Sequence, residues 1–259
     1  MEVTPVNSIY LFDVDGTLTP AKSTIDPVFA KQFLDWCRSR SVYIVSGGSF
    51  VRILNQIKRP IFDQMQGVFA CMGNAYYRNR FNKVDGYSEW DKVYENKFTV
   101  KKKQRFLDEL DWIVKDSPFH IKTGRHHEER VGMLNFSVVG RNATMEQRKV
   151  YEEYDAKFKE REKIVEKLSK KYKGIDFVIG GAVSIDIFNE GNDKSQVMNQ
   201  LGDKLKDHRI VFVGDRIPFP GNDYSLAAVL HQHPNGHAIE VESWRDTAKL
   251  LSTNLFASG

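Results

Sequence analysis

The sequence predicts an α/β protein, a Rossmann-like parallel sheet with an inserted α+β unit. Short apolar runs alternate with stretches of helical periodicity in the first third of the chain and again towards its end, which is typical of βαβ units. Between these regions the chain is more polar, and its predicted strands and helices lose that alternation. We therefore expect residues 1–84 and 190–259 to form one core domain, and residues 85–189 to form a cap domain inserted into it.

Length and composition are those of a globular protein. With 259 residues and 41% hydrophobic content, the chain can bury a sizeable core. No run reaches the roughly 18 apolar residues of a membrane span, and residues 1–8 lack the order of a signal peptide, so we expect a cytoplasmic protein without a membrane partner. The net charge is only +4 and the basic residues are interleaved with acidic ones, so we also expect no nucleic-acid partner.

The first predicted strand, residues 9–12, ends in two carboxylates. Asp13 and Asp15 follow it, and Gly16 turns the chain behind them. Ligands of open α/β sheets bind beyond the carboxyl ends of the strands, so the topology places both carboxylates in a site. The alternative is an Asp-Gly turn that closes a hairpin, but no matching second strand follows.

The run Asp-Val-Asp-Gly-Thr-Leu-Thr at residues 13–19 resembles the first motif of the haloacid dehalogenase superfamily. The resemblance implies that Asp13 is a nucleophile towards phosphoryl groups and that Asp15 is the acid–base residue. It also implies that further motifs follow in a fixed order along the chain.

The second motif of the superfamily is a Ser or Thr at the end of the next strand. Residues 25–39 have helical apolar spacing, and the apolar strand 42–45 comes after them. A hydroxyl and backbone amides at this strand end can hold phosphoryl oxygens. Ser46 fits by position and Ser49 is the alternative, although a helix-capping role would explain either serine.

The elements of the cap are less regular. After a strand at residues 67–70, the periodicity predicts helices and strands mixed in an α+β order. The predicted helices are 98–114 and a long basic one over 145–172, and the predicted strands are 120–122, 133–138, 176–179 and 184–188.

The last part of the chain carries the remaining two motifs. Lys194 opens a predicted helix and supplies a mobile cation that could neutralise a phosphoaspartate. The strand 210–213 leads to Asp215, and Asp223 lies in the loop beyond. Acidic side chains at this strand end can complete an oxygen-ligated Mg²⁺ site with Asp13 and the backbone carbonyl of Asp15.

Segments of the cap indicate which family within the superfamily the sequence resembles. Residues 133–141, 180–188 and 191–194 together look like those of eukaryotic-type phosphomannomutases, and the resemblance runs from about residue 9 to residue 223. It implies a set of residues that hold the sugar and its nonreacting phosphate. In this sequence they are Arg130, Arg141, Arg148, Ser184 and Asp186 in the cap, and Lys22 in the core.

Two departures from the family are visible. Lys22 stands where the family has an arginine, which keeps the charge but loses the planar fork that binds phosphate with paired donors. Residues 224–236 lack the acidic and threonine residues of an accessory cation site, so the ligands of that site are missing from this stretch.

The resemblance implies a phosphomannomutase that interconverts mannose 6-phosphate and mannose 1-phosphate. It further implies an aspartyl-phosphate enzyme, Mg²⁺, a hexose 1,6-bisphosphate as intermediate and activator, and a homodimer formed through the caps. Two other functions stay open. A phosphatase of the same fold would let water attack the aspartyl-phosphate, and a non-catalytic binding protein could keep the fold without the chemistry.

Overall fold

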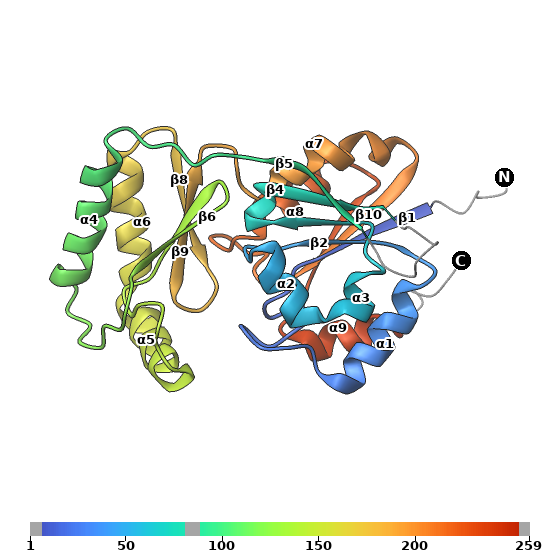
Figure 1. The fold of residues 1–259 in the computed structure, drawn as a ribbon, viewed down its shortest axis with the longest axis horizontal. Coiled ribbons are helices and arrows are strands. Elements are labelled where there is room, and N and C mark those ends of the chain that lie inside the picture. The colour runs from blue at the N-terminus through green and yellow to red at the C-terminus, as the bar shows by residue number, and fades with distance from the viewer. Residues whose placement is uncertain (1–6, 81–88, 254–259) are drawn as a thin grey trace.

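The computed structural model describes residues 7–80 and 89–253 of the chain, in two bodies that each contain a sheet (Figure 1). The larger sheet has seven strands. Their spatial order is β11 (Gly236–Glu240), β10 (His208–Gly214), β1 (Asn7–Phe12), β2 (Ser41–Val45), β3 (Gly67–Ala70), β4 (Ala75–Asn79) and β5 (Trp90–Glu95). The strands from β11 to β3 run parallel, β4 runs antiparallel to β3, and β5 runs antiparallel to β4. The predicted α/β fold class is confirmed.

Helices cover both faces of the larger sheet (Figure 1). One face packs against α1 (Pro27–Cys37), α2 (Phe50–Ile57), α3 (Arg59–Phe62) and α9 (Trp244–Leu250). The other face packs against α7 (Met198–Leu201), α8 (Tyr224–His231) and the 3₁₀ turns η2 (Lys194–Val197) and η3 (Gly202–Lys206). No described helix has both the length and the apolar character needed to cross a membrane.

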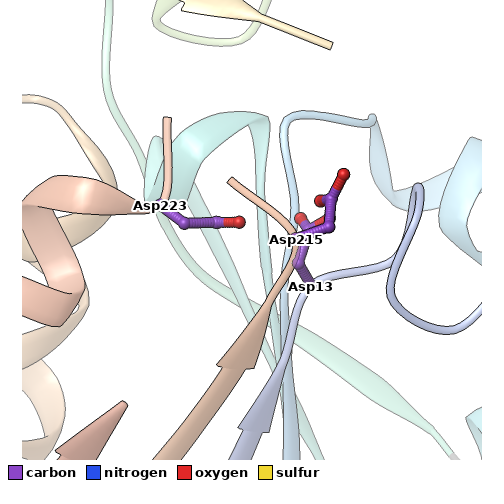
Figure 2. A group of neighbouring side chains, drawn as sticks. All are labelled: Asp13, Asp215 and Asp223. Carbon is purple, nitrogen blue, oxygen red and sulfur yellow. The ribbon is translucent and has the colours of Figure 1, made fainter. Parts of the chain in front are cut away.

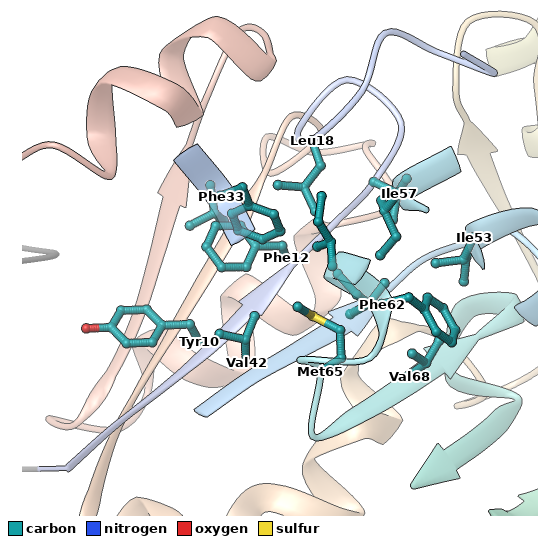
Figure 3. Close-up of a cluster of buried hydrophobic side chains, with 14 of the residues drawn as sticks. Tyr10, Phe12, Leu18, Phe33, Val42, Ile53, Ile57, Phe62, Met65 and Val68 are labelled. Carbon is teal, nitrogen blue, oxygen red and sulfur yellow. The ribbon is translucent and has the colours of Figure 1, made fainter. Parts of the chain in front are cut away.

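The central strand β1 is apolar on both sides because both of its faces are covered. Successive side chains of a strand point to opposite faces. Tyr10 and Phe12 therefore enter the core beneath α1 and α2 (Figure 3). Leu11 enters the core on the opposite face. The rings of Phe12 and Phe33 meet edge to face at 5.3 Å between centroids. This packing fixes the carboxyl end of β1, where the predicted site begins.

The smaller sheet is antiparallel, with helices on its outer side (Figure 1). Its strand order is β6 (His127–Arg130), β7 (Met133–Phe136), β9 (Ser184–Asn189) and β8 (Ile175–Gly180). The covering helices are α4 (Lys103–Asp116), α5 (Met145–Phe158) and α6 (Glu160–Lys171). We call this body the cap and the larger one the core.

The prediction of a long helix over residues 145–172 is wrong. The helix breaks at Lys159, whose backbone is left-handed with φ of 55°. Asp155 accepts hydrogen bonds from the backbone N–H and from Nε of Arg161, both at 2.8 Å. These contacts bind the start of α6 to the end of α5, and the two helices therefore form a corner.

The predicted strand at residues 120–122 is also wrong, because the partner of β7 is β6. The apolar Ile121 suggested a strand, whereas β6 consists of polar residues. It lies at the edge of its sheet, and Arg130 on this strand lines the pocket described below. An edge strand beside a polar pocket has no need of the apolar pattern that identifies buried strands.

The predicted start of the cap at residue 85 lies outside the described residues. Strand β5 pairs with β4 and extends the larger sheet. We therefore propose that the cap begins after Glu95, and that it ends at the end of β9.

Gly140 occupies a position where only glycine fits. Its φ is +86°, and an added Cβ would lie 1.9 Å from the carbonyl oxygen of Thr123. Gly174 has a similar φ of +79° but open space around it. We expect Gly174→Ala to lower the free energy of unfolding by about 1 kcal/mol through backbone strain alone. Gly140→Ala should lower it by about 1–3 kcal/mol more, because the methyl group displaces Thr123. Urea unfolding of both variants measures the difference, and equal losses would contradict the close approach.

Candidate functional site

A pocket lies between the carboxyl ends of the core strands and the uncovered face of the cap sheet. The core lines it with the loops after β1, β2 and β10, and the cap lines it with residues of β6, β7 and β9. Most of its charged side chains belong to the residues predicted from the sequence. They are Asp13, Asp15, Lys22, Arg130, Arg141, Arg148, Asp186 and Asp215, joined by Arg52 and Arg216.

Three carboxylates meet at the core side of this pocket (Figure 2). Asp13 follows β1 and Asp215 follows β10, two strands in parallel register whose ends are joined by a hydrogen bond from the Asp13 N–H to the Val213 carbonyl, 3.0 Å long. Asp223 at the start of α8 points its carboxylate towards them (Figure 2). One oxygen from each of the three lies within 4.8 Å of the others.

Gly16 allows the loop after β1 to approach this cluster. Its φ is +92°, and an added Cβ would lie 2.3 Å from a carboxylate oxygen of Asp215. The glycine of the first motif is therefore needed for space as well as for backbone conformation.

Lys194 binds two of the three carboxylates. Its side chain is fully buried, and Nζ lies 2.6 Å from Asp13 Oδ1 and 2.5 Å from Asp223 Oδ1. Burial favours the neutral amine, but Asp13 and Asp223 outweigh it, and the pKa of Lys194 is raised. The second oxygen of Asp223 accepts the backbone N–H of Arg216 at 3.0 Å. Both oxygens of Asp223 are thus engaged, and this residue holds Lys194 in place.

The acidic cluster suits a divalent cation. Burial raises the pKa of Asp13 well above its usual range, and the nearby Asp223 and Asp215 add to the shift against the effect of Lys194. Burial and Asp223 raise the pKa of Asp215 to about 6. Crowded carboxylates need positive charge to remain ionised, and a set of oxygen donors is what Mg²⁺ prefers.

The two candidate serines of the second motif differ in position. Ser46 is buried at the end of β2 and lines the pocket, where its Oγ accepts the backbone N–H of Gly48 at 3.2 Å. Ser49 is exposed and caps α2, with its Oγ accepting the N–H of Arg52 at 3.4 Å. Only Ser46 faces the pocket directly, so we favour it for phosphate contact.

Asp15 is held by Lys22 and by two residues that the sequence analysis did not identify, Arg52 and Gln56. Arg52 Nη2 forms an ion pair with Asp15 Oδ2. Gln56 Nε2 donates to Oδ1 at 2.8 Å, and the backbone N–H of Lys22 donates to the same oxygen at 2.6 Å. Arg52 and Gln56 are one helical turn apart on α2, and this spacing after the second motif is the signal that could have revealed them.

The three cap arginines of the pocket come from strand β6, from the loop after β7 and from helix α5. Arg130 donates to Glu128 at 2.9 Å and to the backbone carbonyl of Gly47 in the core at 2.8 Å. Arg141 forms an ion pair with the same Glu128 at 2.5 Å. Glu128 and Arg130 are two residues apart on β6, so their side chains lie on the same face of the strand. This spacing is the signal that could have identified Glu128 from the sequence.

Arg148 on α5 is the least satisfied of these cations. The residue is only 7% exposed, and its Nη1 has no hydrogen-bond partner among the described residues. Burial and the nearby Arg52 lower its pKa, although an arginine stays protonated at neutral pH. A buried guanidinium with a free donor is suited to an anionic ligand.

Ser184 and Asp186 lie on the pocket face of β9, because the intervening Ile185 enters the core of the cap. Asp186 Oδ1 accepts from Asn135 Nδ2 at 2.6 Å, and Asn135 Oδ1 accepts from Arg141 at 2.5 Å. Ser184 Oγ donates to the Gly180 carbonyl at 2.9 Å. Asn135 is a further residue missed from the sequence, and it aligns Asp186 with Arg141.

Lys22 lines the same pocket as these arginines and adds a cationic side chain from the core. Partial burial and the surrounding arginines, first Arg148 and Arg141, lower the pKa of Lys22 to about 7. The like charges disfavour its protonated form, and an anion among them would favour it.

The match to known proteins is clearest in sequence. The sequence profile described as eukaryotic phosphomannomutase matches residues 30–257. The chain belongs to the eukaryotic phosphomannomutase family. The phosphomannomutase of Saccharomyces cerevisiae is 34% identical over 254 residues, covering 96% of this chain and 94% of the yeast protein. That of Dendrobium officinale is 33% identical over 251 residues, covering 96% of this chain and 94% of the orchid protein. The predicted family is therefore confirmed.

Solved structures resemble this phosphomannomutase family member in fold. The C-terminal domain of the Candida albicans trehalose-6-phosphate phosphatase superposes with a TM-score of 0.60 at 16% identity, covering 95% of this chain and 91% of that domain. A haloacid dehalogenase-like hydrolase from Bacteroides thetaiotaomicron gives 0.55 at 12% identity, covering 95% and 98%. Membership of the phosphomannomutase family, together with the acidic cluster, implies a metal-dependent enzyme.

The lowered pKa of Lys22 predicts that anion binding takes up protons. At about pH 8 the free amine is mostly neutral, and an anion in the pocket should restore its charge, with uptake of about one proton per site. Calorimetric titration with sulfate in buffers of different ionisation enthalpy measures this uptake, because sulfate itself does not titrate there. Lys22→Arg, which is charged throughout, should abolish the uptake. Equal uptake by this variant would assign the titration to another group.

Proposed function

We propose that this protein is a phosphomannomutase that interconverts mannose 6-phosphate and mannose 1-phosphate. The observation that carries the proposal is the placement of the buried, incompletely bonded Arg148 in the same pocket as Asp13. A hexose with phosphates at both ends needs a reactive centre at one side and an anion site at the other. The family to which the chain belongs supports the same substrate.

Asp13 is the proposed nucleophile. One of its carboxylate oxygens attacks the phosphorus atom of the donor, the bond between phosphorus and the sugar oxygen breaks, and an aspartyl-phosphate forms. Lys194, held by Asp13 and Asp223, neutralises charge on the phosphoryl oxygens, and Ser46 donates to them. The carboxylates of Asp13 and Asp215 and the backbone carbonyl of Asp15 would hold Mg²⁺, which supplies further positive charge there. Asp223 would join them as a ligand only by releasing one of its present partners.

Asp15 is the proposed acid–base residue. It gives a proton to the departing sugar oxygen in one half-reaction and takes one from the attacking sugar hydroxyl in the other. The hexose 1,6-bisphosphate turns around between the two half-reactions. The same compound serves as activator, because it phosphorylates Asp13 when the resting enzyme carries no phosphoryl group.

The cap residues are proposed to hold whichever phosphate is not reacting. Arg130, Arg141 and Arg148 supply paired donors for this phosphate, and Lys22 adds charge from the core. Ser184 and Asp186 would contact sugar hydroxyl groups. Because these groups meet the core in one pocket, substrate binding also shields the aspartyl-phosphate from water.

Assembly and location belong to the same proposal. We propose a homodimer formed through the caps, which β6 supports as the edge strand of the cap sheet, since an edge offers backbone groups to a second strand. Light scattering should give twice the 29.9 kDa of one chain, and a mass of one chain would contradict the dimer. Cys37 and Cys71 are both free thiols, which is consistent with the proposed cytoplasmic location.

The direct test incubates the protein with Mg²⁺, mannose 1-phosphate and a trace of glucose 1,6-bisphosphate. We expect mannose 6-phosphate without equivalent release of free phosphate. Asp13→Asn should lower turnover by at least about 10⁴-fold, because the nucleophile is lost. Free phosphate without the isomer would indicate a phosphatase. Neither product from any hexose phosphate, with Asp13→Asn equal to the wild type in ligand binding, would indicate a binding protein.

A further inference from the structure

Asp15 is bound more firmly than its proposed role in proton transfer requires. Its Oδ2 is paired with Arg52, and its Oδ1 accepts from Gln56 at 2.8 Å and from the Lys22 backbone at 2.6 Å. The cluster of carboxylate oxygens within 4.8 Å of one another contains Asp13 but not Asp15. The described structure therefore shows an acid–base carboxylate whose oxygens are both engaged by other groups.

The two side chains that hold Asp15 differ in how firmly they are anchored. Gln56 is 5% exposed, and its Nε2 also lies 3.3 Å from the Ser23 carbonyl and 3.4 Å from Thr19 Oγ1. The Arg52 side chain is 27% exposed, and Asp15 is its only ion-pair partner among the described residues. Gln56 is thus a fixed support, whereas Arg52 can move at the cost of one ion pair.

Arg52 is also placed to respond to an anion. It lines the pocket between Asp15 and the cap, and its charge acts on Lys22, Arg141 and Arg148. A phosphate dianion among these cations carries more negative charge than the Asp15 carboxylate and offers more acceptor oxygens to a guanidinium fork. The arriving phosphate of a substrate would therefore compete with Asp15 for Arg52.

We propose that Arg52 is a positioning residue that withholds Asp15 from the reaction until a sugar phosphate fills the pocket. The proposal rests on the mutase function given above. With Arg52 drawn to the phosphate, Asp15 Oδ2 becomes free, while Gln56 and the Lys22 N–H still hold Oδ1. Oδ2 is therefore the oxygen that exchanges a proton with the sugar.

The ion pair between Arg52 and Asp15 separates phosphoryl transfer to a sugar from hydrolysis by water. In transfer, the sugar hydroxyl oxygen bonds to phosphorus, its proton passes to Asp15 Oδ2, and the bond from phosphorus to Asp13 breaks. In hydrolysis, water would do the same, with its proton passing to Oδ2 and inorganic phosphate leaving. When no sugar phosphate is bound, Oδ2 is paired with Arg52 and water has no base. The aspartyl-phosphate then survives between turnovers.

The test follows release of phosphate from the phosphorylated protein without any sugar. Acetyl phosphate is a suitable donor, because acetate leaves as an anion and needs no proton from Asp15. After loading in Mg²⁺ and removal of the donor, we expect Arg52→Gln to release phosphate at least about tenfold faster than the wild type, since a positioned base contributes about 10²–10⁴-fold to such steps. Arg52→Lys, which keeps a charge for Asp15, should fall between the two.

Two controls make the result specific. The double variant Arg52→Gln with Asp15→Asn should return to slow release, because the freed base is gone. Arg59→Gln removes an exposed arginine paired with Asp63 on the neighbouring helix and should match the wild type. Thermal melting of each variant shows that it is folded.

Unchanged release in Arg52→Gln would overturn the inference, and so would fast release that persists after Asp15→Asn. Parallel assays with mannose 1-phosphate keep the two proposals apart. A wild type that isomerises while Arg52→Gln releases phosphate no faster contradicts only the role of Arg52. A wild type that releases phosphate and forms no isomer contradicts the mutase function itself.

Discussion

The site depends on one buried ammonium group between two carboxylates. Lys194 lies fully inside the protein, with Asp13 on one side and Asp223 on the other. Removing charges from water is costly, and a buried pair with one partner missing is strongly destabilising. Lys194, Asp13 and Asp223 therefore fix one another, and with them the ends of β1 and β10 and the start of α8. In its proposed role as nucleophile, Asp13 would need no rearrangement before it meets a phosphoryl group.

The cap keeps part of its positive charge available for an anionic ligand. Glu128 neutralises part of the field of Arg130 and Arg141, whereas Arg148 keeps an unbonded donor and Lys22 a lowered pKa. The alternation of β9 turns Ile185 and Ile187 into the core of the cap and leaves polar groups towards the pocket. The hydrophobic packing of the cap thus orients the residues that are proposed to bind the substrate.

The sequence predicted those parts whose signal is local. The apolar runs that end in Asp13, Ser46 and Asp215 identified the parallel strands, because a buried strand must be apolar throughout. The break at Lys159 was missed, since it depends on contacts between Asp155 and Arg161 that form only in the folded cap. The edge strand β6 was missed because a strand beside a polar pocket has no apolar pattern.

The surroundings of Asp15 could not be predicted from the motifs, because they too depend on contacts that form only in the folded protein. A motif identifies a carboxylate, but whether that carboxylate is available depends on side chains from another element, here Arg52 and Gln56 on α2. Phosphatases and mutases that share an aspartyl-phosphate share its motifs as well. What separates them is the access of water and of a base to the phosphoryl group. In our proposal, the distinction resides in the contacts that tie Asp15 to substrate binding, and these contacts lie outside the motifs that identify the superfamily.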